Sequence, residues 1–218
     1  RLRGRGVGGE GVATLVLLLL LLLPTFAFAQ ADERPFYFGV DLSYVNEVED
    51  CGATYRENGE QRDPFELFAA HGATLVRARL WHNPDWTEYS TLDDVKRTFT
   101  RARDAGMATL LDIHYSDTWA DAGTQTIPAA WADLDDDALA DTVYQYTTDV
   151  LTELVAADLV PAFVQIGNET NGGILKRGSD QNWAHDARMF NAGIRAVREF
   201  SADTGNNVLI MLHVAQPE

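Results

Sequence analysis

Short apolar segments alternate along the chain with longer segments in which apolar residues recur every three or four positions. Short apolar runs are typical of buried strands, and the longer spacing is typical of helices with one buried face. The predicted strands span residues 36–43, 74–80, 107–114, 161–167 and 207–214. This alternation predicts repeated βα units that build a parallel sheet.

Four helices are predicted between these strands. The first begins at Asp63-Pro64, a capping side chain followed by proline at the first helical position, and stops at Gly72. The second follows Thr91 and ends at Gly106. The third and fourth are indicated by the apolar stripes Leu139, Val143, Tyr146, Val150, Leu154 and Trp183, Ala187, Phe190, Ile194, Val197. Each helix therefore has one face to cover a sheet.

The connections that follow strands differ from those that follow helices. Residues 81–90, 115–137 and 168–182 are long, polar and rich in aromatic residues, whereas the turn at Gly72-Ala73 is short. In barrels of βα units, the chemistry lies on the loops after the strands. These three loops are therefore the predicted functional rim.

An open, doubly wound sheet could be built from the same elements, but no glycine-rich phosphate loop follows the first predicted strand. Strand side chains alternate between two faces, and one face here is polar. Its members are Asp41, Ser43, Arg77, Arg79, Trp81, Asp112, His114, Gln165, Gly167, Glu169 and His213. A polar interior favours a barrel whose mouth holds a polar ligand. Arg77 and Asp112 could equally well form a buried ion pair that compensates its own charges and binds no ligand.

Residues 1–29 have the features of a secretory signal peptide. Arg1, Arg3 and Arg5 precede the apolar run 15–23, which is too short to cross a bilayer and leads to the small-residue pattern at Ala27-Phe28-Ala29. A retained membrane anchor is the alternative. We therefore expect a signal peptide over 1–29, a folded part over 30–218, secretion, and no stable membrane association after cleavage.

The charge of the chain argues against nucleic-acid and anionic membrane partners. Seventeen basic and 33 acidic residues give a net charge of −16, and removal of residues 1–29 leaves 14 basic and 32 acidic residues, or −18. This surface fits either a salt-rich environment or simply solvated helix faces. Cys51 is the only cysteine, so no intrachain disulfide can form.

The end of the fourth predicted strand carries the chemistry. Asn168 and Glu169 place an amide and a carboxyl group together at the rim. A carboxyl group in a dehydrated, aromatic-lined cleft keeps its proton to higher pH, as a general acid toward a glycosidic oxygen requires. Indole rings stack on sugar faces, and the neighbouring loops contain Trp81, Trp86, Tyr115, Trp119 and Trp131. We expect Trp119 to face the ligand and Trp131 to be structural.

Several blocks in order along the chain carry a resemblance to a known family. They are GVDLS at 39–43, VRARLW at 76–81, LDIHYSDTWAD at 111–121, PAAW at 128–131 and VQIGNE at 164–169. The sequence resembles glycoside hydrolase family 53, the arabinogalactan endo-β-1,4-galactanases, and the match continues to about His213. Residues 121–123 and 173–178 depart from the family pattern, which affects loop shape and subsite preference more than the reaction.

The resemblance implies a retaining hydrolase on a (β/α)8 barrel, of which residues 30–218 are the N-terminal five-eighths. Glu169 would be the acid/base, and Asn168 would hold the 2-hydroxyl of the sugar at the cleavage subsite. The other substrate-binding residues would be Arg79, His114, Asp117, Trp119 and His213. No cofactor is implied; some relatives hold a structural calcium ion, which makes one a candidate in the complete protein. We expect a monomer.

The length of the chain leads to a further expectation. A complete barrel takes about 250 residues, so three βα units and the family's nucleophile, on the seventh strand, would lie beyond residue 218. We expect the 218-residue fragment alone to be inactive and prone to aggregate. Three alternatives stay open: a related mannanase or xylanase, a non-catalytic carbohydrate-binding barrel, and a metal-dependent hydrolase using His82, His114 and His213.

Overall fold

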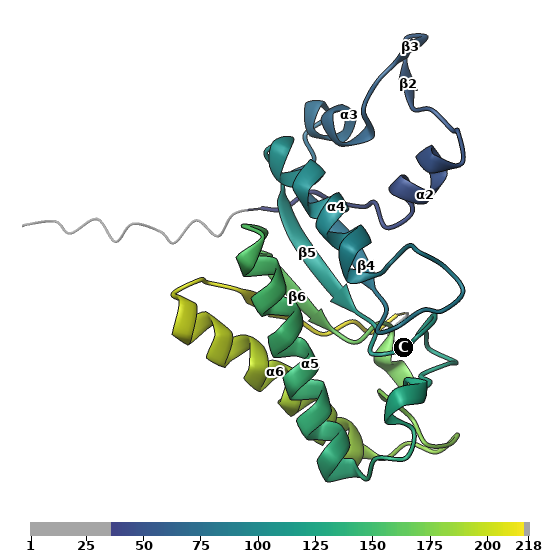
Figure 1. Cartoon of the computed structure of the whole chain (residues 1–218), viewed down its shortest axis with the longest axis vertical. Coiled ribbons are helices and arrows are strands. Elements are labelled where there is room, and N and C mark those ends of the chain that lie inside the picture. The colour runs from purple at the N-terminus through teal and green to yellow at the C-terminus, as the bar shows by residue number, and fades with distance from the viewer. Residues whose placement is uncertain (1–35, 216–218) are drawn as a thin grey trace, which may run out of the picture. The chain divides into compact units, whose positions relative to one another are not determined.

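The computed structural model describes residues 36–215 and has a five-stranded parallel sheet at its centre (Figure 1). The strands are β1 (Gly39–Asp41), β4 (Leu75–Leu80), β5 (Ala108–Ile113), β6 (Phe163–Ile166) and β7 (Leu209–Met211), and each pairs with the next. A doubly wound sheet reverses its order at one point, and this sheet does not. The succession is that of the wall of a (β/α)8 barrel, as predicted.

The four predicted helices are present: α3 (Pro64–Ala70), α4 (Leu92–Asp104), α5 (Asp136–Ala156) and α6 (Trp183–Thr204). Each begins where a polar side chain accepts a hydrogen bond from a first-turn N–H group, which has no partner within the helix. The capping residues are Asp63, Thr91, Asp135 and Asn182. Within residues 36–215, no helix combines the length and the apolarity needed to cross a bilayer. The predicted signal peptide lies outside the described residues.

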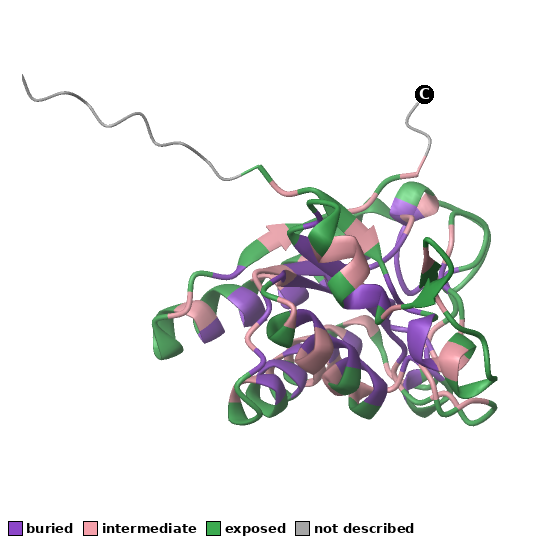
Figure 2. Cartoon of the chain, turned by 90° about the horizontal axis from the view of Figure 1, so that it is seen from above, coloured by how far each residue is buried: buried purple, intermediate pink, exposed green. Residues whose placement is uncertain are grey.

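The outer face of the sheet is apolar and covered by helices. Leu80 of β4, together with Leu111 and Ile113 of β5, belongs to one buried cluster with Phe99 of α4 and Leu151 of α5. Figure 1 shows α4, α5 and α6 beside the strands, and Figure 2 shows buried residues where helices meet the sheet. Burial of this apolar surface fixes which face of each strand points away from the helices.

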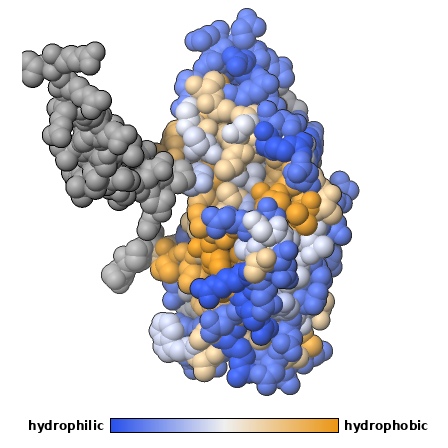
Figure 3. All heavy atoms as spheres, turned by 90° about the vertical axis from the view of Figure 1, so that its left-hand side faces the viewer, coloured by the Kyte–Doolittle hydropathy of each residue, from blue (hydrophilic) through white to orange (hydrophobic). Residues whose placement is uncertain are grey.

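The inner face is polar, as the alternation predicts. Asp41 of β1 is in register with Arg77 of β4, and Arg79 is in register with Asp112 of β5, which is in register with Gln165 of β6. Towards β7 the surface becomes apolar, and its exposed large side chains are Leu209, Met211, Leu212 and Val214. Figure 3 shows apolar residues gathered midway along one side of the molecule.

Two expectations about the elements were wrong. The first and last strands are three residues long, not eight, because each pairs with one neighbour only in the described part of the chain. The interval between the first strand and α3 also contains structure that was not predicted. It holds α2 (Val45–Asp50) and a hairpin of β2 (Arg56–Glu57) and β3 (Glu60–Gln61). Short polar segments of this kind carry no readable period.

Candidate functional site

Arg77 lies at the centre of the polar face and joins three strands. Its guanidinium pairs with Asp41 of β1, and its Nη2 lies 2.7 Å from Oδ2 of Asp112 on β5. The same group donates to Oδ1 of Asn168 at 2.8 Å and to Oε1 of Gln165 at 3.3 Å. Asp112 is completely buried. A buried carboxylate needs such a partner, so the pair holds the strands in register.

Asp41 shows the effect of this pairing on acidity. Its partial burial raises the pKa, but hydrogen bonds from Ser43 and the charge of Arg77 outweigh that effect. The pKa of Asp41 therefore lies below its usual range, and the carboxylate stays ionised beside Arg77.

A tight turn after β6 brings Asn168 and Glu169 to the rim. Gly167 has φ of 79°, and a Cβ atom there would lie 2.7 Å from Cγ2 of Thr170 and 2.9 Å from Cδ1 of Ile174. Glu169 itself is left-handed, with φ of 45° and ψ of 51°. Strained backbone of this kind is costly and is found where a side chain must be aimed. The turn projects two polar side chains from the end of one strand.

The side chain of Asn168 is held from three directions. Its Oδ1 accepts from Arg77 and lies 2.8 Å from Nδ1 of His213, while its Nδ2 donates to the carbonyl of Ala120 at 2.8 Å. A carboxamide has two N–H groups. Among the described residues the second N–H has no hydrogen-bond partner, so it remains for a ligand oxygen.

Glu169 has a fixed backbone and a partly exposed carboxyl group. Its Oε2 lies 3.4 Å from the N–H of Ala122, in the loop between β5 and α5. Gln125 of that loop donates to the carbonyl of Asn168 at 2.7 Å, and the N–H of Thr170 donates to the carbonyl of His213 at 2.9 Å. The turn is thus fastened on both sides while the carboxyl group stays accessible.

Arg79 of β4 lies in a cage of aromatic rings. Its guanidinium carbon is 4.5 Å from the ring centre of Tyr44, 4.4 Å from that of Trp81 and 4.2 Å from that of Trp119. Nε and Nη2 donate to Oγ of Ser90, and no carboxylate of the described residues forms an ion pair with it. Burial lowers its pKa from the usual value. The three rings contact the cation directly, while Asp41 and Asp112 act on its charge without forming an ion pair with it.

Trp119 forms the outer wall of this cage. Its side chain is 41% exposed, whereas Arg79 beneath it is only 4% exposed. An exposed indole backed by a cation offers a flat apolar surface to a sugar ring. Trp119 is therefore exposed at the surface, and its contact with a ligand stays a prediction.

His114 lies beneath the rim. Its Nε2 is 3.0 Å from Oδ2 of Asp112, and its Nδ1 accepts from the N–H of Ala120 at 3.1 Å. The ring is almost completely buried. Both ring nitrogens of His114 are therefore bonded to protein groups. His114 can position the residues around it, but neither nitrogen is free to bond to a sugar. Its expected role of lining the subsite is limited to this positioning.

Asp117 organises the loop in which it lies. Its Oδ1 is 2.9 Å from Nδ1 of His82 and accepts from the N–H of Asn83, while its Oδ2 accepts from the N–H of Ala129 at 2.8 Å. Trp131 is buried, with its ring centre 4.4 Å from that of His82, in agreement with a structural role. Direct sugar contact by Asp117 stays a prediction.

The three histidines of the metal-dependent alternative do not converge. His82 bonds to Asp117, His114 to Asp112 and His213 to Asn168. Across residues 36–215, no group of three or more His, Cys, Asp or Glu side chains is arranged to hold a metal ion. These residues therefore do not fit a catalytic metal centre.

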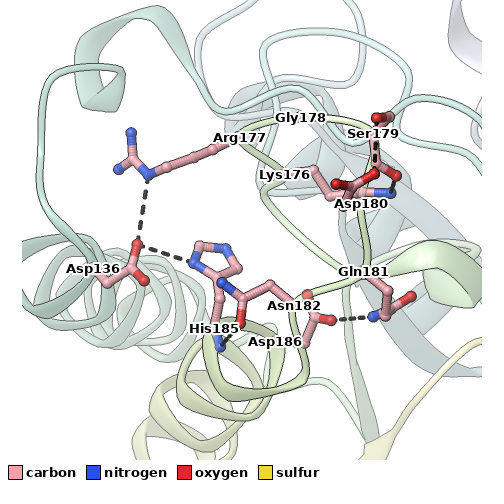
Figure 4. A pocket seen from close by; sticks show the side chains of 10 residues that line it. All are labelled: Asp136, Lys176, Arg177, Gly178, Ser179, Asp180, Gln181, Asn182, His185 and Asp186. Atoms are coloured by element: carbon pink, nitrogen blue, oxygen red, sulfur yellow. Dashed lines mark hydrogen bonds and ion pairs between the residues drawn. The ribbon is translucent and has the colours of Figure 1, made fainter.

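A cavity lies at the far end of the loop that begins with Glu169 (Figure 4). Its volume is about 520 Å³, and buried His185 of α6 crosses one side, with Nδ1 3.0 Å from Oδ1 of Asp136 and Nε2 3.0 Å from the carbonyl of Leu175. Nε of Arg177 lies 3.5 Å from the same Asp136 oxygen. The network anchors this loop to the start of α5.

Some functional residues were not foreseen. The sequence analysis treated Arg77 as half of a charge pair, yet it also orients Asn168. Gln125 and Tyr44 carried no signal, because their contacts join segments far apart in sequence. Ser90, which holds Arg79, has φ of 56° and lies in a loop without a recognisable motif.

Comparison with known proteins gives consistent relatives. The family model "Glycosyl hydrolase family 53" matches residues 37–218. An arabinogalactan endo-beta-1,4-galactanase of Cellvibrio japonicus (strain Ueda107) is 54% identical over 194 residues, covering 86% of this chain and 52% of the relative. An endo-beta-1,4-galactanase of Bacillus subtilis (strain 168) is 36% identical over 193 residues, covering 85% and 43%. The chain spans about half the length of these relatives.

Solved structures agree with the sequence comparison. A fungal beta-1,4-galactanase structure superposes with a TM-score of 0.77 at 37% identity, covering 83% of this chain and 54% of the other. The Ignisphaera aggregans GH53 catalytic domain superposes with a TM-score of 0.75 at 32% identity, covering 84% and 53%. Both likenesses extend over most of the described residues.

Proposed function

Because the chain belongs to glycosyl hydrolase family 53, we propose that the whole protein is an endo-acting, retaining β-1,4-galactanase that cleaves (arabino)galactan. One observation carries the proposal: the left-handed turn after β6 presents the Glu169 carboxyl group beside Asn168, which keeps one N–H for a ligand. A carboxyl group and an amide at one strand end suit proton donation to a glycosidic oxygen and binding of a sugar hydroxyl.

The sugar that is cleaved would lie over the polar face. Asn168 would donate to its 2-hydroxyl, and Trp119 would stack on the apolar face of the substrate chain. Arg79 supports Trp119 from below, and His213 supports Asn168. The aromatic cage and the Glu169 turn would thus contact neighbouring parts of one saccharide.

A retaining hydrolase needs a second carboxylate about 5 Å from the first. Asp41 and Asp112 are ion-paired to Arg77, and Asp121 accepts from the N–H groups of Gly123 and Thr124. These carboxylates already have structural partners. We therefore assign the nucleophile to a part of the whole protein outside residues 36–215.

The remaining properties follow from the sequence. The arginines and apolar run of residues 1–29 support secretion by a signal peptide, and the net charge of −16 disfavours nucleic acid as a partner. We propose a monomer that needs no cofactor for the reaction. A structural calcium ion, if the whole protein holds one, would use ligands outside the described residues.

Replacement of Glu169 by Gln in the whole protein tests the proposal. The amide keeps the shape of the side chain but cannot donate an acidic proton, so release of reducing ends from galactan should fall about 10²- to 10⁴-fold. Hydrolysis of an aryl β-galactoside with an acidic phenol should fall less, because its leaving group needs little protonation. The matched control is Glu153→Gln on α5, whose partner is the surface Lys96.

Three outcomes contradict the proposal. Unchanged hydrolysis of galactan by the Glu169→Gln variant removes Glu169 from the acid/base role. A wild-type protein that cleaves mannan or xylan in preference to galactan identifies a related glycanase instead. A protein that binds galactan without cleaving it is a carbohydrate-binding barrel.

A further inference from the structure

A second cavity lies next to the Glu169 turn. Its volume is about 470 Å³, within the range of small-ligand sites. One wall is the loop segment 122–126, and the other is formed by Lys176, Gly178 and Ser179. These residues are separate from the aromatic cage of Arg79 and from the polar network of Arg77.

The first wall is connected directly to the proposed acid. The N–H of Ala122, which lines the cavity, lies 3.4 Å from Oε2 of Glu169. Gln125 bonds to the carbonyl of Asn168 at 2.7 Å. One residue of the cavity wall is therefore in contact with the carboxyl group of Glu169, and another is bonded to the same turn.

The second wall is fastened to the first. The N–H of Lys176 donates to the carbonyl of Gln125 at 2.7 Å, and Thr126 and Lys176 form a parallel β-bridge. The two walls thus form one unit that does not depend on side-chain contacts. A preformed site of this kind binds with less loss of conformational entropy.

Lys176 is the only lysine among the residues that line this cavity. Its Nζ donates to the carbonyl of Ser179 at 3.1 Å, and no carboxylate of the described residues lies within ion-pair distance. A Cβ atom on Gly172 would lie 3.4 Å from this Nζ, so glycine leaves room for it. An ammonium group has three N–H donors. At least one therefore has no protein acceptor among residues 36–215.

The other lysine of the sequence has a different environment. Lys96 on α4 lies 2.9 Å from Oε2 of Glu153 on α5, in an ion pair at the surface. Lys176, by contrast, forms an ion pair with none of the described carboxylates. This contrast indicates that Lys176 is available to a ligand.

We propose that this cavity is a saccharide subsite on the leaving-group side of Glu169, in which Lys176 donates to a hydroxyl group of the departing sugar chain. The inference rests on the proposed function and adds a specificity-determining residue. The cleaved sugar lies toward Asn168, whereas Oε2 of Glu169 faces Ala122. The oxygen that receives the proton, and the units attached to it, therefore extend toward Lys176.

The test compares two substrates in the whole protein. Lys176→Met keeps most of the length of the side chain and removes the donor, so kcat/KM on galactan should fall about 2- to 10-fold, as for one lost hydrogen bond. An aryl β-galactoside has no sugar beyond the cleaved bond, so its kcat/KM should fall less. Lys176→Arg should restore most of the activity on galactan. Lys96→Met is the matched control and should leave both rates unchanged.

Binding provides an independent measurement. In a Glu169→Gln background, Lys176→Met should weaken binding of a galacto-oligosaccharide by a similar factor in calorimetry. An equal loss on both substrates, or unchanged kinetics and binding, overturns the subsite. If the wild-type protein does not hydrolyse galactan, the proposed function fails, and the calorimetric comparison still decides whether Lys176 binds the saccharide.

Discussion

Two arginines, one half-buried and one buried, lie two positions apart on the same face of β4, and their surroundings are opposite. Arg77 pairs with the carboxylates of Asp41 and Asp112 and donates to Asn168. Arg79 has a hydroxyl group and three aromatic rings around it, with no ion-paired carboxylate in the described part of the chain. Arg77 is therefore ion-paired to carboxylates, and Arg79 is not.

The two arginines of β4 therefore have different structural roles. The Arg77 network connects β1, β4, β5 and β6, so its charges hold the sheet together and fix the amide of Asn168. The Arg79 cage ends in the exposed ring of Trp119. A cation kept away from carboxylates strengthens an aromatic platform without adding a competing hydrogen-bond network. The comparison predicts different costs for removing each charge.

Arg77→Met in the whole protein should have the largest effect on folding. It leaves the completely buried Asp112 without its cation, and breaking a buried pair costs about 3–5 kcal/mol. The free energy of unfolding, measured with denaturant, should fall by that amount. Glu153→Gln, which breaks a surface pair, should cost about 0–1 kcal/mol. Equal losses in the two variants would show that Asp112 does not depend on Arg77.

Arg79→Met should have a smaller effect. The variant loses cation–π contacts and the hydrogen bonds to Ser90 but leaves no unpaired carboxylate, so we expect a loss of about 1–3 kcal/mol. The measurement is the same denaturant titration. A loss as large as that of Arg77→Met would contradict the distinction between the two regions.

The smallest effect concerns the acid stability of the Arg77 network. The pKa of Asp41 is held below its usual 3.8, so its stabilisation is present above that pH and is lost as the pH falls through the lowered folded-state pKa. The difference in unfolding free energy between wild type and Asp41→Asn should therefore be constant near neutral pH and shrink below about pH 3.8. A difference independent of pH down to acid unfolding would contradict this assignment.

The sheet was predictable because its pattern depends on short-range sequence. Alternation placed Arg77, Asp112 and Gln165 on one face, and the register confirms it. The lengths of the edge strands were overestimated because the apolar residues extend beyond the three positions that pair with the neighbouring strand. The helix α2 was missed because only Val45 and Asn46 of its six residues are buried.

The sequence predicted which residues lie at this end of the sheet but not their contacts. Asn168 and Glu169 follow β6, and Arg79 contacts the ring of Trp119, while the roles of these residues toward a substrate stay predictions. The sequence could not indicate that both ring nitrogens of His114 bond to protein groups. One of the partners is the backbone N–H of Ala120, and a backbone group carries no sequence signal. Such contacts depend on loop conformation, which residue types alone do not determine.

The glycine before Asn168 limits how such a protein can diversify. At position 167, any added carbon meets Thr170 and Ile174, and the backbone is left-handed as well. That position is effectively restricted to one amino acid. If Glu169 is the acid, variation at 122–126 and 176–179 can alter the proposed subsite without changing the backbone that positions its carboxyl group.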